Sequence, residues 1–439
     1  MVRRFWVETL GCPKNHVDSD KLTGTLLADG LVPAESPEAA DLVVVNTCAF
    51  VEEARQESID TILGLSDRTR ERDAELVVTG CLAERYGDDL AEALPEADAV
   101  VGFGVPVSLG PTRKAPSFDL LNLPRPAPTA PWAYVKIAEG CDRACGFCAI
   151  PSFRGPQRSR TQESILDEVD ALAAGGVREI VLVAQDLAAY GRDQGQGSRQ
   201  IVPLLEAVAA RVDRSRLLYL YPSDLTDGLI DAICATGVPY FDLSLQHVAR
   251  PLLRRMRRWG DGERFLERIE AIRARVPEAT FRSNFIVGYP GETEQDHDEL
   301  LRFVETAQVD WVGFFPYSRE DGTYAADLDG QVDRVLMQER LAELRDLQDP
   351  ITAARRDELI GSTIEVLVDQ PGVARSHREA PEIDGIVNVP TSLPVGSLVK
   401  VRITGAAGPD LDAEADVDAA GGPPSTSRPD SGPSHAVPG

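Results

Sequence analysis

The sequence predicts an α/β protein with three parts: an N-terminal parallel α/β domain, a central partial (βα) barrel and a small C-terminal antiparallel β-barrel. Short apolar, β-branched runs alternate with helix-like segments over most of the chain, and the pattern changes to short alternating strands after Gly361. Alternating strands and helices are typical of parallel sheets covered by helices. The predicted divisions are residues 1–105, a proline-rich linker at 106–131, the barrel at 132–358, the small barrel at 359–411 and a disordered tail at 412–439.

In the N-terminal part, three similar runs each end in a cysteine. These runs are "FWVETLGC", "DLVVVNTC" and "ELVVTGC", which end at Cys12, Cys48 and Cys81. Helix-like segments at 18–30 and 51–65 separate them. Because the loops after parallel strands gather at one edge of a sheet, we expect these three cysteines to converge in space.

Six further strand–helix units follow the linker. The expected strands are 133–138, 179–184, 217–221, 240–245, 280–287 and 311–315. The expected helices include 161–174, 227–235, 262–275 and 294–306, and a long helix at 332–358 closes the domain. Successive βα units of this kind indicate a barrel or partial barrel, with its site at the carboxyl ends of the strands.

The C-terminal region has a different character. "STIEVLVDQ", "GIVNVP" and "SLVKVRITGA" read as short strands separated by Gly and Pro, which predicts a small β-barrel. From Asp412 onward the composition is too polar and too rich in Pro and Gly to bury a core, so we expect a disordered tail.

Composition limits the classes of protein that this chain can belong to. The chain has 439 residues, of which 43% are hydrophobic and 26% charged, and its seven cysteines are too few, and odd in number, for a disulfide scaffold. The longest apolar run, "DLVVVNTCAFV", is about half the length that spans a bilayer. We therefore expect a cytoplasmic protein without a membrane partner. The net charge of −26 argues against non-specific coating of nucleic acid and permits a basic partner.

Three cysteines lie close together in "EGCDRACGFC". Cys141, Cys145 and Cys148 are spaced C-x-x-x-C-x-x-C on a loop after the first barrel strand. Three thiolates are one short of the four that usually hold a zinc ion or a cluster, and no histidine lies nearby. A three-cysteine iron–sulfur cluster would leave one iron open. The alternative is that these thiols pack as small hydrophobic groups.

This motif, followed by a six-unit βα barrel, resembles the radical S-adenosylmethionine superfamily. The resemblance implies a [4Fe–4S] cluster on the three cysteines and S-adenosyl-L-methionine at its open iron. Cofactor contacts are implied for "FIVGYPGETE" and for positions beside the cluster loop; the candidates are Phe147, Gln185, Asp186, Gly288, Gly291 and Glu292. Phe147 could equally pack in the core, and Gln185 and Asp186 could equally end a strand. Arg154, Arg158 and Arg160 could pair with the cofactor or lie on the surface.

The N-terminal part resembles the methylthiotransferase family within that superfamily. The resemblance rests on "ETLGCPKNHVDSD", "VVNTCAF" and "VVTGCLAERY", and it extends over residues 4 to 410. It implies a second [4Fe–4S] cluster held by Cys12, Cys48 and Cys81, with S-adenosylmethionine acting both as methyl donor and as radical source. Cys234, the seventh cysteine, is expected to be packed.

Two substrate classes are implied by the family: tRNA adenosines, and the β-carbon of an aspartate in ribosomal protein S-twelve. The "GCPKN" segment resembles the ribosomal-protein branch, although His16, Asp20 and Ser244 depart from its usual residues. The terminal barrel resembles a TRAM module. It carries six Lys or Arg against seven Asp or Glu between Arg355 and Gly405, which is a poor balance for gripping RNA phosphates.

We therefore expect a methylthiotransferase acting on ribosomal protein S-twelve, with a tRNA methylthiotransferase as the nearest alternative. An electron donor such as flavodoxin or ferredoxin is the other expected partner, and a monomer is the expected state. A different class, an electron-transfer or structural iron–sulfur protein, is disfavoured because each cysteine triad lacks a fourth ligand.

Overall fold

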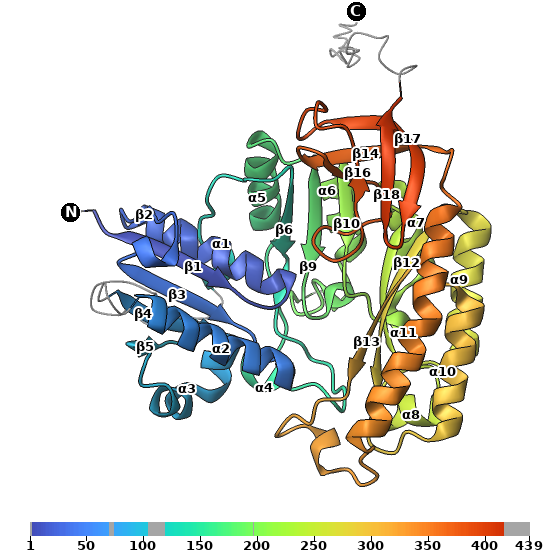
Figure 1. Cartoon of the computed structure of the whole chain (residues 1–439), viewed down its shortest axis with the longest axis horizontal. Helices are drawn as coiled ribbons and strands as arrows, with labels where there is room; N and C mark the ends of the chain where they lie inside the picture. The colour runs from blue at the N-terminus through green and yellow to red at the C-terminus, as the bar shows by residue number, and fades with distance from the viewer. Residues whose placement is uncertain (1, 70–73, 104–118, 196, 417–439) are drawn as a thin grey trace, which may run out of the picture.

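The computed structural model describes residues 2–69, 74–103, 119–195 and 197–416. Figure 1 shows three parts: an N-terminal α/β unit in blue, a central unit whose colour runs from teal through green and yellow to the orange helix α11, and a β-barrel in orange-red beside its upper end. The predicted fold class is confirmed. Most of the predicted linker, up to residue 118, and the predicted tail from residue 417 onward lie outside the described residues. No helix within the described ranges is long and apolar enough to cross a membrane.

The N-terminal unit is a five-stranded parallel sheet flanked by helices. Its strands are β1 (Arg4–Thr9), β2 (Val32–Pro33), β3 (Leu42–Thr47), β4 (Glu75–Gly80) and β5 (Ala99–Val100), and its helices are α1 (Pro13–Ala28), α2 (Glu52–Thr69) and α3 (Cys81–Ala93). The strand order is β2-β1-β3-β4-β5, and every pairing is parallel. In this doubly wound order the strand sequence reverses between β1 and β3, which is where such sheets bind ligands.

Helix α1 begins earlier than the expected segment 18–30. Cys12 is its N-cap residue and Pro13 occupies the first turn. Proline suits that position because its missing N–H would have no intrahelical partner and its φ is already helical. The early start matters because it places the residues after Cys12 on a rigid helical turn instead of on a loop.

The central unit is a partial barrel of six parallel strands. The strands are β6 (Trp132–Lys136), β9 (Glu179–Val183), β10 (Arg214–Leu217), β11 (Tyr240–Gln246), β12 (Thr280–Val287) and β13 (Trp311–Pro316), with a short ribbon of β7 (Ala138–Glu139) and β8 (Arg158–Ser159). The helices are α4 (Ile150–Arg154), α5 (Gln162–Ala174), α6 (Ile201–Ala209), α7 (Asp227–Ala235), α8 (Arg250–Arg255), α9 (Gly262–Arg275), α10 (Glu294–Ala307) and α11 (Arg334–Asp357).

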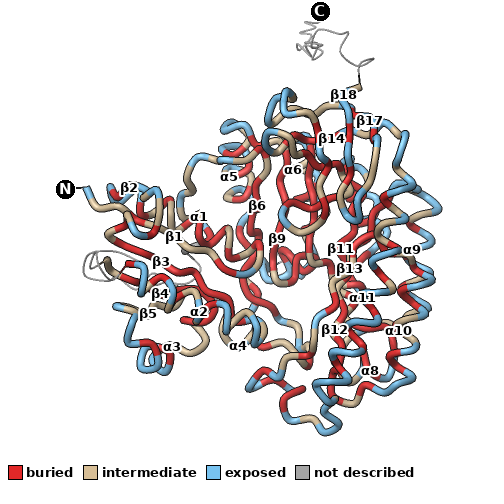
Figure 2. The backbone as a smooth tube through the Cα atoms, in the orientation of Figure 1, coloured by how far each residue is buried: buried red, intermediate tan, exposed pale blue. Residues whose placement is uncertain are grey.

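Two three-stranded sheets make up this barrel. Their orders are β10-β9-β6 and β11-β12-β13, and one parallel bridge between Leu220 and Leu243 joins them. The buried residues concentrate between the strands and the surrounding helices, as the red segments in Figure 2 show. The predicted partial barrel is thus confirmed.

The predicted position of one barrel strand is wrong. The apolar run 217–221 was expected to be the strand, but β10 covers Arg214–Leu217 instead. Arg214 and Arg216 are 5% and 1% exposed, so two charged residues occupy buried strand positions. They are stable there because the carboxylate of Glu179 and backbone carbonyls of the C-terminal barrel accept their hydrogen bonds.

The C-terminal unit is a closed five-stranded barrel. Its strands are β14 (Thr363–Gln370), β15 (Val373–Arg375), β16 (Val387–Asn388), β17 (Leu398–Ala407) and β18 (Asp410–Ala415), closed in the order β14-β15-β16-β18-β17. The predicted small antiparallel barrel is confirmed, with one exception: β16 pairs with β18 in parallel. Strand β18 also runs past the predicted domain end at residue 411, since Leu411 and Ala413 turn into the barrel core.

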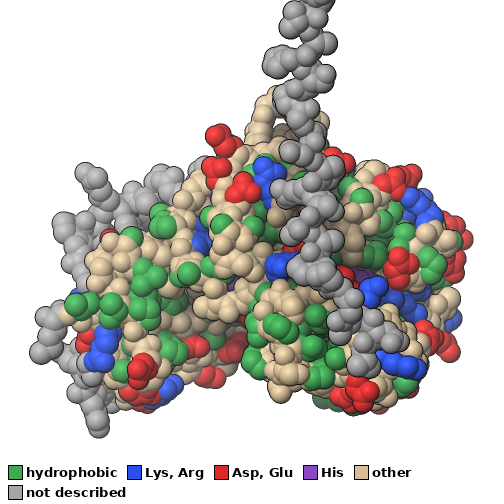
Figure 3. Space-filling view, turned by 90° about the horizontal axis from the view of Figure 1, so that it is seen from above, with side chains coloured by type: hydrophobic (Ala, Val, Ile, Leu, Met, Phe, Trp, Pro, Cys, Tyr) green, Lys and Arg blue, Asp and Glu red, His purple; other side chains and the backbone are tan. Residues whose placement is uncertain are grey.

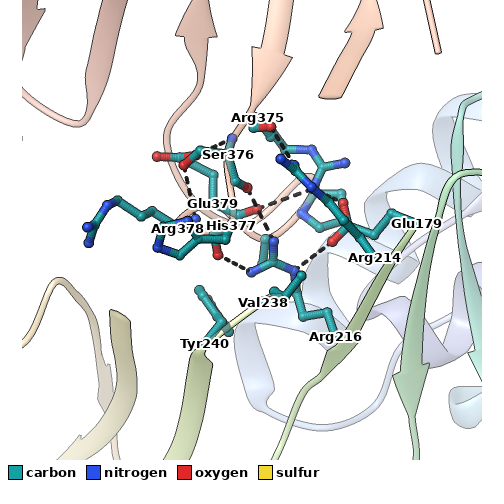
Figure 4. A network of polar contacts seen from close by, with 12 residues as sticks. Glu179, Arg214, Arg216, Val238, Tyr240, Arg375, Ser376, His377, Arg378 and Glu379 are labelled. Atoms are coloured by element: carbon teal, nitrogen blue, oxygen red, sulfur yellow. Dashed lines mark hydrogen bonds and ion pairs between the residues drawn. The ribbon is translucent and has the colours of Figure 1, made fainter. Parts of the chain in front are cut away.

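A buried ion-pair network, drawn in Figure 4, fastens this barrel to the central unit. Glu179 is fully buried and accepts from Arg216 Nε at 2.8 Å and from Arg375 Nη1 at 3.0 Å. Arg214 Nη1 donates to the carbonyl oxygen of Arg375 at 2.9 Å. Burial alone would raise the pKa of Glu179, but Arg375, Arg216 and Arg214 lower it to about 2.

Glu179→Gln is expected to destabilise the protein by about 3–5 kcal/mol at pH 7, because it leaves buried arginines without their carboxylate. The pKa of Glu179 lies below its ordinary value of 4.5, so the wild-type contribution is present above pH 4.5 and is lost as pH falls toward 2. The melting-temperature difference between wild type and variant should therefore shrink over that window. Glu75→Gln, which removes a half-exposed partner of Arg3, is the matched control and should cost about 1 kcal/mol or less. A constant difference from pH 7 to pH 3 would contradict this assignment.

Candidate metal centres

The first cysteine triad lies at the carboxyl edge of the N-terminal sheet. Cys12 caps α1, Cys48 follows β3 and Cys81 begins α3. Gly11 has a φ of +92°, and a Cβ built there would lie 2.8 Å from Cys48 Cβ, so the loops after β1 and β3 are in direct contact. A Cβ built on Gly80, next to Cys81, would lie 2.5 Å from Thr47 N, next to Cys48, so the end of β4 contacts the end of β3 as well and the three cysteines lie at one edge, as predicted.

Asn15 ties the three strand ends together. It is fully buried, and its Nδ2 donates to the carbonyl oxygens of Leu10 at 2.8 Å and Thr47 at 3.0 Å. Its Oδ1 lies 3.7 Å from Cys81 Sγ. One side chain from the "GCPKN" segment thus contacts the loops that carry all three thiols.

The three thiols differ in their readiness to ionise. Burial and the neighbouring Cys12 raise the pKa of Cys48 to about 12, and burial also raises the pKa of Cys81. Burial would raise the pKa of Cys12 as well, but Lys14 and Arg154 outweigh it and lower that pKa. Cys12 is therefore the thiol of this triad that gives up its proton first.

The second triad lies on the loop between β7 and α4. Burial raises the pKa of Cys141 to about 11 and that of Cys148 to about 12. Arg258 Nη1 lies 3.3 Å from Cys145 Sγ, so a guanidinium from the segment after α8 faces this loop. High thiol pKa values mean that a metal must displace protons on binding, which makes loading dependent on pH.

A buried charge network lies between the two triads. Glu139, which precedes the second triad, accepts from Lys136 Nζ and from Arg154 Nη1, each at 2.9 Å. Arg154 Nη1 also donates to Asp18 Oδ2 at 3.1 Å, and its Nη2 lies 3.0 Å from Cys81 Sγ. Burial would raise the pKa of Glu139, but Arg154 and Lys136 lower it to about 2. Arg154 thereby connects the second cysteine loop to the first triad.

The expectation for the arginines after the second triad needs correction. Arg154 and Arg160 are 4% and 2% exposed, so neither is a surface residue. Arg160 pairs with Glu168 and Arg154 with Asp18 and Glu139, so protein carboxylates occupy these two guanidiniums, for which a cofactor contact or a surface position was predicted. Arg158, the third arginine of that prediction, is partly exposed.

Gln185 and Asp186 both face the second cysteine loop. Gln185 Nε2 donates to Glu139 Oε1 at 2.5 Å, and Asp186 accepts from Arg143 Nε at 2.6 Å. Gln185 Oε1 is buried and has no hydrogen-bond partner within the described residues. Since buried polar atoms are normally paired, this oxygen is available to a ligand donor.

The remaining predicted cofactor contacts lie in tightly packed surroundings. Phe147 packs on the main core. Cβ atoms built on Gly288 and Gly291 would lie 2.6 Å from Met337 Cε and 2.9 Å from Arg255 Nε, so close packing already requires both glycines. Glu292 accepts from Gly288 N at 2.6 Å and from Arg340 Nη1 at 2.9 Å. Their contact with a cofactor stays a prediction.

The donor sets are compatible with iron–sulfur clusters. No three His, Cys, Asp or Glu side chains in the described ranges are arranged to hold one metal ion. A cluster is compatible with this, because each of its irons takes a separate thiolate and the three sulfurs need not surround one point. The ligands that each triad offers are all thiols. Those of the first triad come from the ends of three strands, and those of the second come from one loop. Cys234, by contrast, packs against the core as expected.

Sequence reasoning missed a clamp between the N-terminal and central units. Glu320, 2% exposed on the segment after β13, accepts from Arg55 Nη1 and Arg85 Nη1, each at 2.5 Å. Arg85 Nη1 also donates to the carbonyl oxygen of Ala49, next to Cys48. On the same segment Ala325 N donates to the carbonyl oxygen of Gly146, inside the second cysteine loop. This segment therefore contacts the surroundings of both triads.

Glu320→Gln is expected to loosen the N-terminal unit, at a cost on the order of 3 kcal/mol, because two arginines lose their shared buried carboxylate. Hydrogen exchange of α2 and α3 should accelerate while that of β12 is unchanged. Glu38→Gln, which removes the exposed partner of Arg68 on α2, is the control and should leave exchange as in wild type. Equal acceleration in both variants would contradict the clamp.

Comparison with known families assigns the three units. Residues 4–102 match the uncharacterized protein family UPF0004, residues 135–304 match the radical SAM superfamily and residues 360–415 match the TRAM domain. The protein is thus a radical S-adenosylmethionine enzyme, a class that uses a [4Fe–4S] cluster and S-adenosylmethionine, and its radical SAM domain lies between the two other matched domains along the chain.

Its relatives define the family more closely. The chain is 42% identical to the ribosomal protein uS12 methylthiotransferase RimO of Kineococcus radiotolerans, over 92% of this chain and 96% of the relative. It is also 42% identical to RimO of Moorella thermoacetica, over 91% of this chain and 96% of the relative. The chain belongs to the RimO family of radical SAM methylthiotransferases. Among solved structures it is similar to a radical SAM methyltransferase, TsrM from Kitasatospora setae, with a TM-score of 0.48 and 15% identity, covering 82% of this chain and 91% of that one.

Proposed function

We propose that this enzyme methylthiolates the β-carbon of an aspartate in ribosomal protein S-twelve, the uS12 of its relatives' names. The family relationship supports this reading over the tRNA alternative. In this proposal Cys12, Cys48 and Cys81 hold one [4Fe–4S] cluster, and Cys141, Cys145 and Cys148 hold the other. When bound, the clusters and S-adenosylmethionine supply the radical that removes a hydrogen atom from the substrate carbon and the methylated sulfur that replaces it.

The residues around the triads have separate tasks in this proposal. Asn15 fixes the spacing of the first three thiols through its contacts with Leu10 and Thr47. Gln185 offers its unpaired buried oxygen to a donor of the cofactor. The remaining proposed cofactor contacts, which the comparisons do not test, are Phe147, Asp186, Gly288, Gly291 and Glu292.

The charge on the C-terminal barrel is the observation that carries the choice of substrate. Of the six cations between Arg355 and Gly405, three form buried or half-buried ion pairs: Arg355 with Asp310, Arg356 with Glu379, and Arg375 with Asp369 and Glu179. Arg378 Nη1 donates to Thr280 Oγ1 at 3.3 Å, inside the interface with the central unit. Most of the positive charge counted from the sequence therefore faces inward.

The two exposed cations of this barrel are each opposed by an acid. Lys400 on β17 lies across from Glu365 on β14, and Arg402 lies across from Glu414 on β18. On the face shown in Figure 3, acidic and basic side chains both occur, scattered among apolar and uncharged atoms. Because RNA binding depends on uncompensated cations that displace counterions, this surface suits a basic protein better than a phosphate backbone.

The test uses anaerobically reconstituted full-length protein with S-adenosylmethionine and dithionite, given either recombinant uS12 or tRNA. The expected result is one methylthio group on a single aspartate of uS12, identified by mass spectrometry of its peptides, and unmodified tRNA. A methylthio group on tRNA and none on uS12 would overturn the substrate assignment. A flavodoxin or ferredoxin as the electron donor, a monomeric state and a cytoplasmic location are proposed with it.

A further inference from the structure

Lys14 is a cation beside the first triad with an unusual environment. It lies two residues after Cys12, on the first turn of α1, and its ammonium nitrogen is 3.5 Å from the centroid of the Tyr219 ring. A cation at this distance from an aromatic face is attracted by the ring quadrupole. Lys14 has no ion pair with any acidic side chain in the described part of the chain, and it is partly exposed.

The other cations near the cysteines have polar partners. The cationic side chains that contact the six cysteines or shift their pKa are Lys14, Arg143, Arg154 and Arg258. Arg154 is held by Asp18 and Glu139, and Arg143 by Asp186 and Asp224. Arg258 donates to Cys145 Sγ and to the carbonyl oxygen of Ser244. Within this set of four, Lys14 is therefore the cation whose charged group has no polar protein partner among the described residues, so it can bind a ligand.

Tyr219 has a backbone conformation that is unfavourable for a non-glycine residue. It is a non-glycine residue with a φ of +65°, a conformation that persists only where the surroundings enforce it. Its backbone N–H donates to Asp242 Oδ2 at 2.9 Å, and the next residue, Leu220, forms the bridge that joins the two halves of the barrel. The barrel seam therefore fixes the ring under Lys14.

The segment that carries Tyr219 reaches both triads. Tyr219 lies against Lys14, which follows Cys12 by two residues. Two residues on, the ring of Tyr221 lies 4.2 Å below the guanidinium carbon of Arg258, which contacts Cys145. The segment from Tyr219 to Tyr221 therefore contacts a side chain next to the first triad, Lys14, and a side chain that touches the second, Arg258.

The aspartate that the proposed function modifies carries a negative charge, which the site beside the first triad must accommodate. A [4Fe–4S] cluster held by three thiolates would carry a net negative charge, so an aspartate brought next to it would be repelled, and the repulsion is strong in a partly buried site. An ammonium offers three donors and a compact positive charge, which match a carboxylate. We propose that Lys14 is the specificity-determining residue that binds the side-chain carboxylate of the target aspartate, with Tyr219 as the positioning residue that holds it. This inference rests on the proposed function.

The test measures discrimination between two forms of the substrate. Binding of uS12, and of uS12 with the target residue changed Asp→Asn, is measured on reconstituted full-length enzyme, together with KM and kcat for the unchanged uS12. Wild type should prefer the Asp form by about tenfold, as expected for loss of one charge-assisted hydrogen bond. Lys14→Met should reduce that preference to about one by weakening only the Asp form. Lys14→Arg should restore part of it, and Tyr219→Leu should lose part of it.

Each outcome bears on one of the two proposals. Arg275→Met, on the outer helix α9 where Arg275 pairs with Asp231, is the matched control and should keep the preference of wild type. If Lys14→Met weakens both forms equally, or retains the preference, the assignment of Lys14 is wrong. Should Lys14→Met fail to fold, an unchanged preference in Tyr219→Leu would contradict the proposal equally well. If wild type modifies tRNA and not uS12, the proposed function fails, and the role of Lys14 fails with it.

Discussion

Cys48→Ala is expected to abolish the methylthiolated product while cleavage of S-adenosylmethionine continues. Cys48 is 6% exposed at the end of β3, in a domain separate from the loop of the second triad, so its loss should leave that loop intact. Product should fall by more than about 100-fold, since loss of an outer-shell partner alone costs 10–100-fold at metal sites. 5′-Deoxyadenosine and modified peptide are quantified in the same reaction.

Two further variants complete this experiment. Cys145→Ala should abolish both 5′-deoxyadenosine and product, because it removes a proposed ligand of the second triad. Cys234→Ala is the control and should stay within about twofold of wild type, since Cys234 packs at the edge of the core far from both triads in the chain. Methylthiolated product from Cys48→Ala would contradict the assignment of a second cluster to the first triad.

Arg154→Met is expected to have the largest effect on stability of any single change between the triads. Arg154 is 4% exposed and contacts Asp18, Glu139, Asn15 and Cys81. Its removal leaves Asp18 and Glu139 with Lys136 as their remaining cation, at an expected cost of about 3–5 kcal/mol. Thermal unfolding of the metal-free protein measures this cost directly.

Two further variants serve as controls in that experiment, one for the shape of the side chain and one for the loss of an exposed ion pair. Arg154→Lys keeps the charge but loses the forked donors, so it should fall between wild type and Arg154→Met. Arg178→Met removes an exposed pair with Asp213 and should cost about 1 kcal/mol or less. If Arg154→Met and Arg178→Met melt at the same temperature, the network between the triads does not stabilise the fold.

The two triads illustrate how much of the site the sequence predicts. Cys141, Cys145 and Cys148 are close together in the chain, so one loop must bring them together whatever the fold. Cys12, Cys48 and Cys81 are far apart, yet their convergence could be predicted because each ends a β-branched run and parallel strands share a carboxyl edge. The second triad was thus predictable from its spacing in one loop, and the first from a local pattern that is repeated three times.

The surroundings of the triads could not be predicted in the same way. "RSRLLYLYP" was expected to place its strand on the apolar residues, but the strand is Arg214–Leu217, because Glu179 and the C-terminal barrel supply partners for two arginines. Arg154 was expected at a cofactor or on the surface, and it lies in the interior between the triads.

The sequence by itself determined the order of the domains, the positions of the six cysteines and the edges at which they lie, because hydrophobic periodicity and covalent spacing are local properties of the chain. Only the tertiary structure decided which charges are buried, which cations remain free and which residues connect the triads. Lys14 and Tyr219 are separated by about two hundred residues, and their contact depends on how two domains meet. A buried charge is stable only beside a group of opposite charge or a hydrogen-bond partner, and which group lies there depends on the tertiary structure.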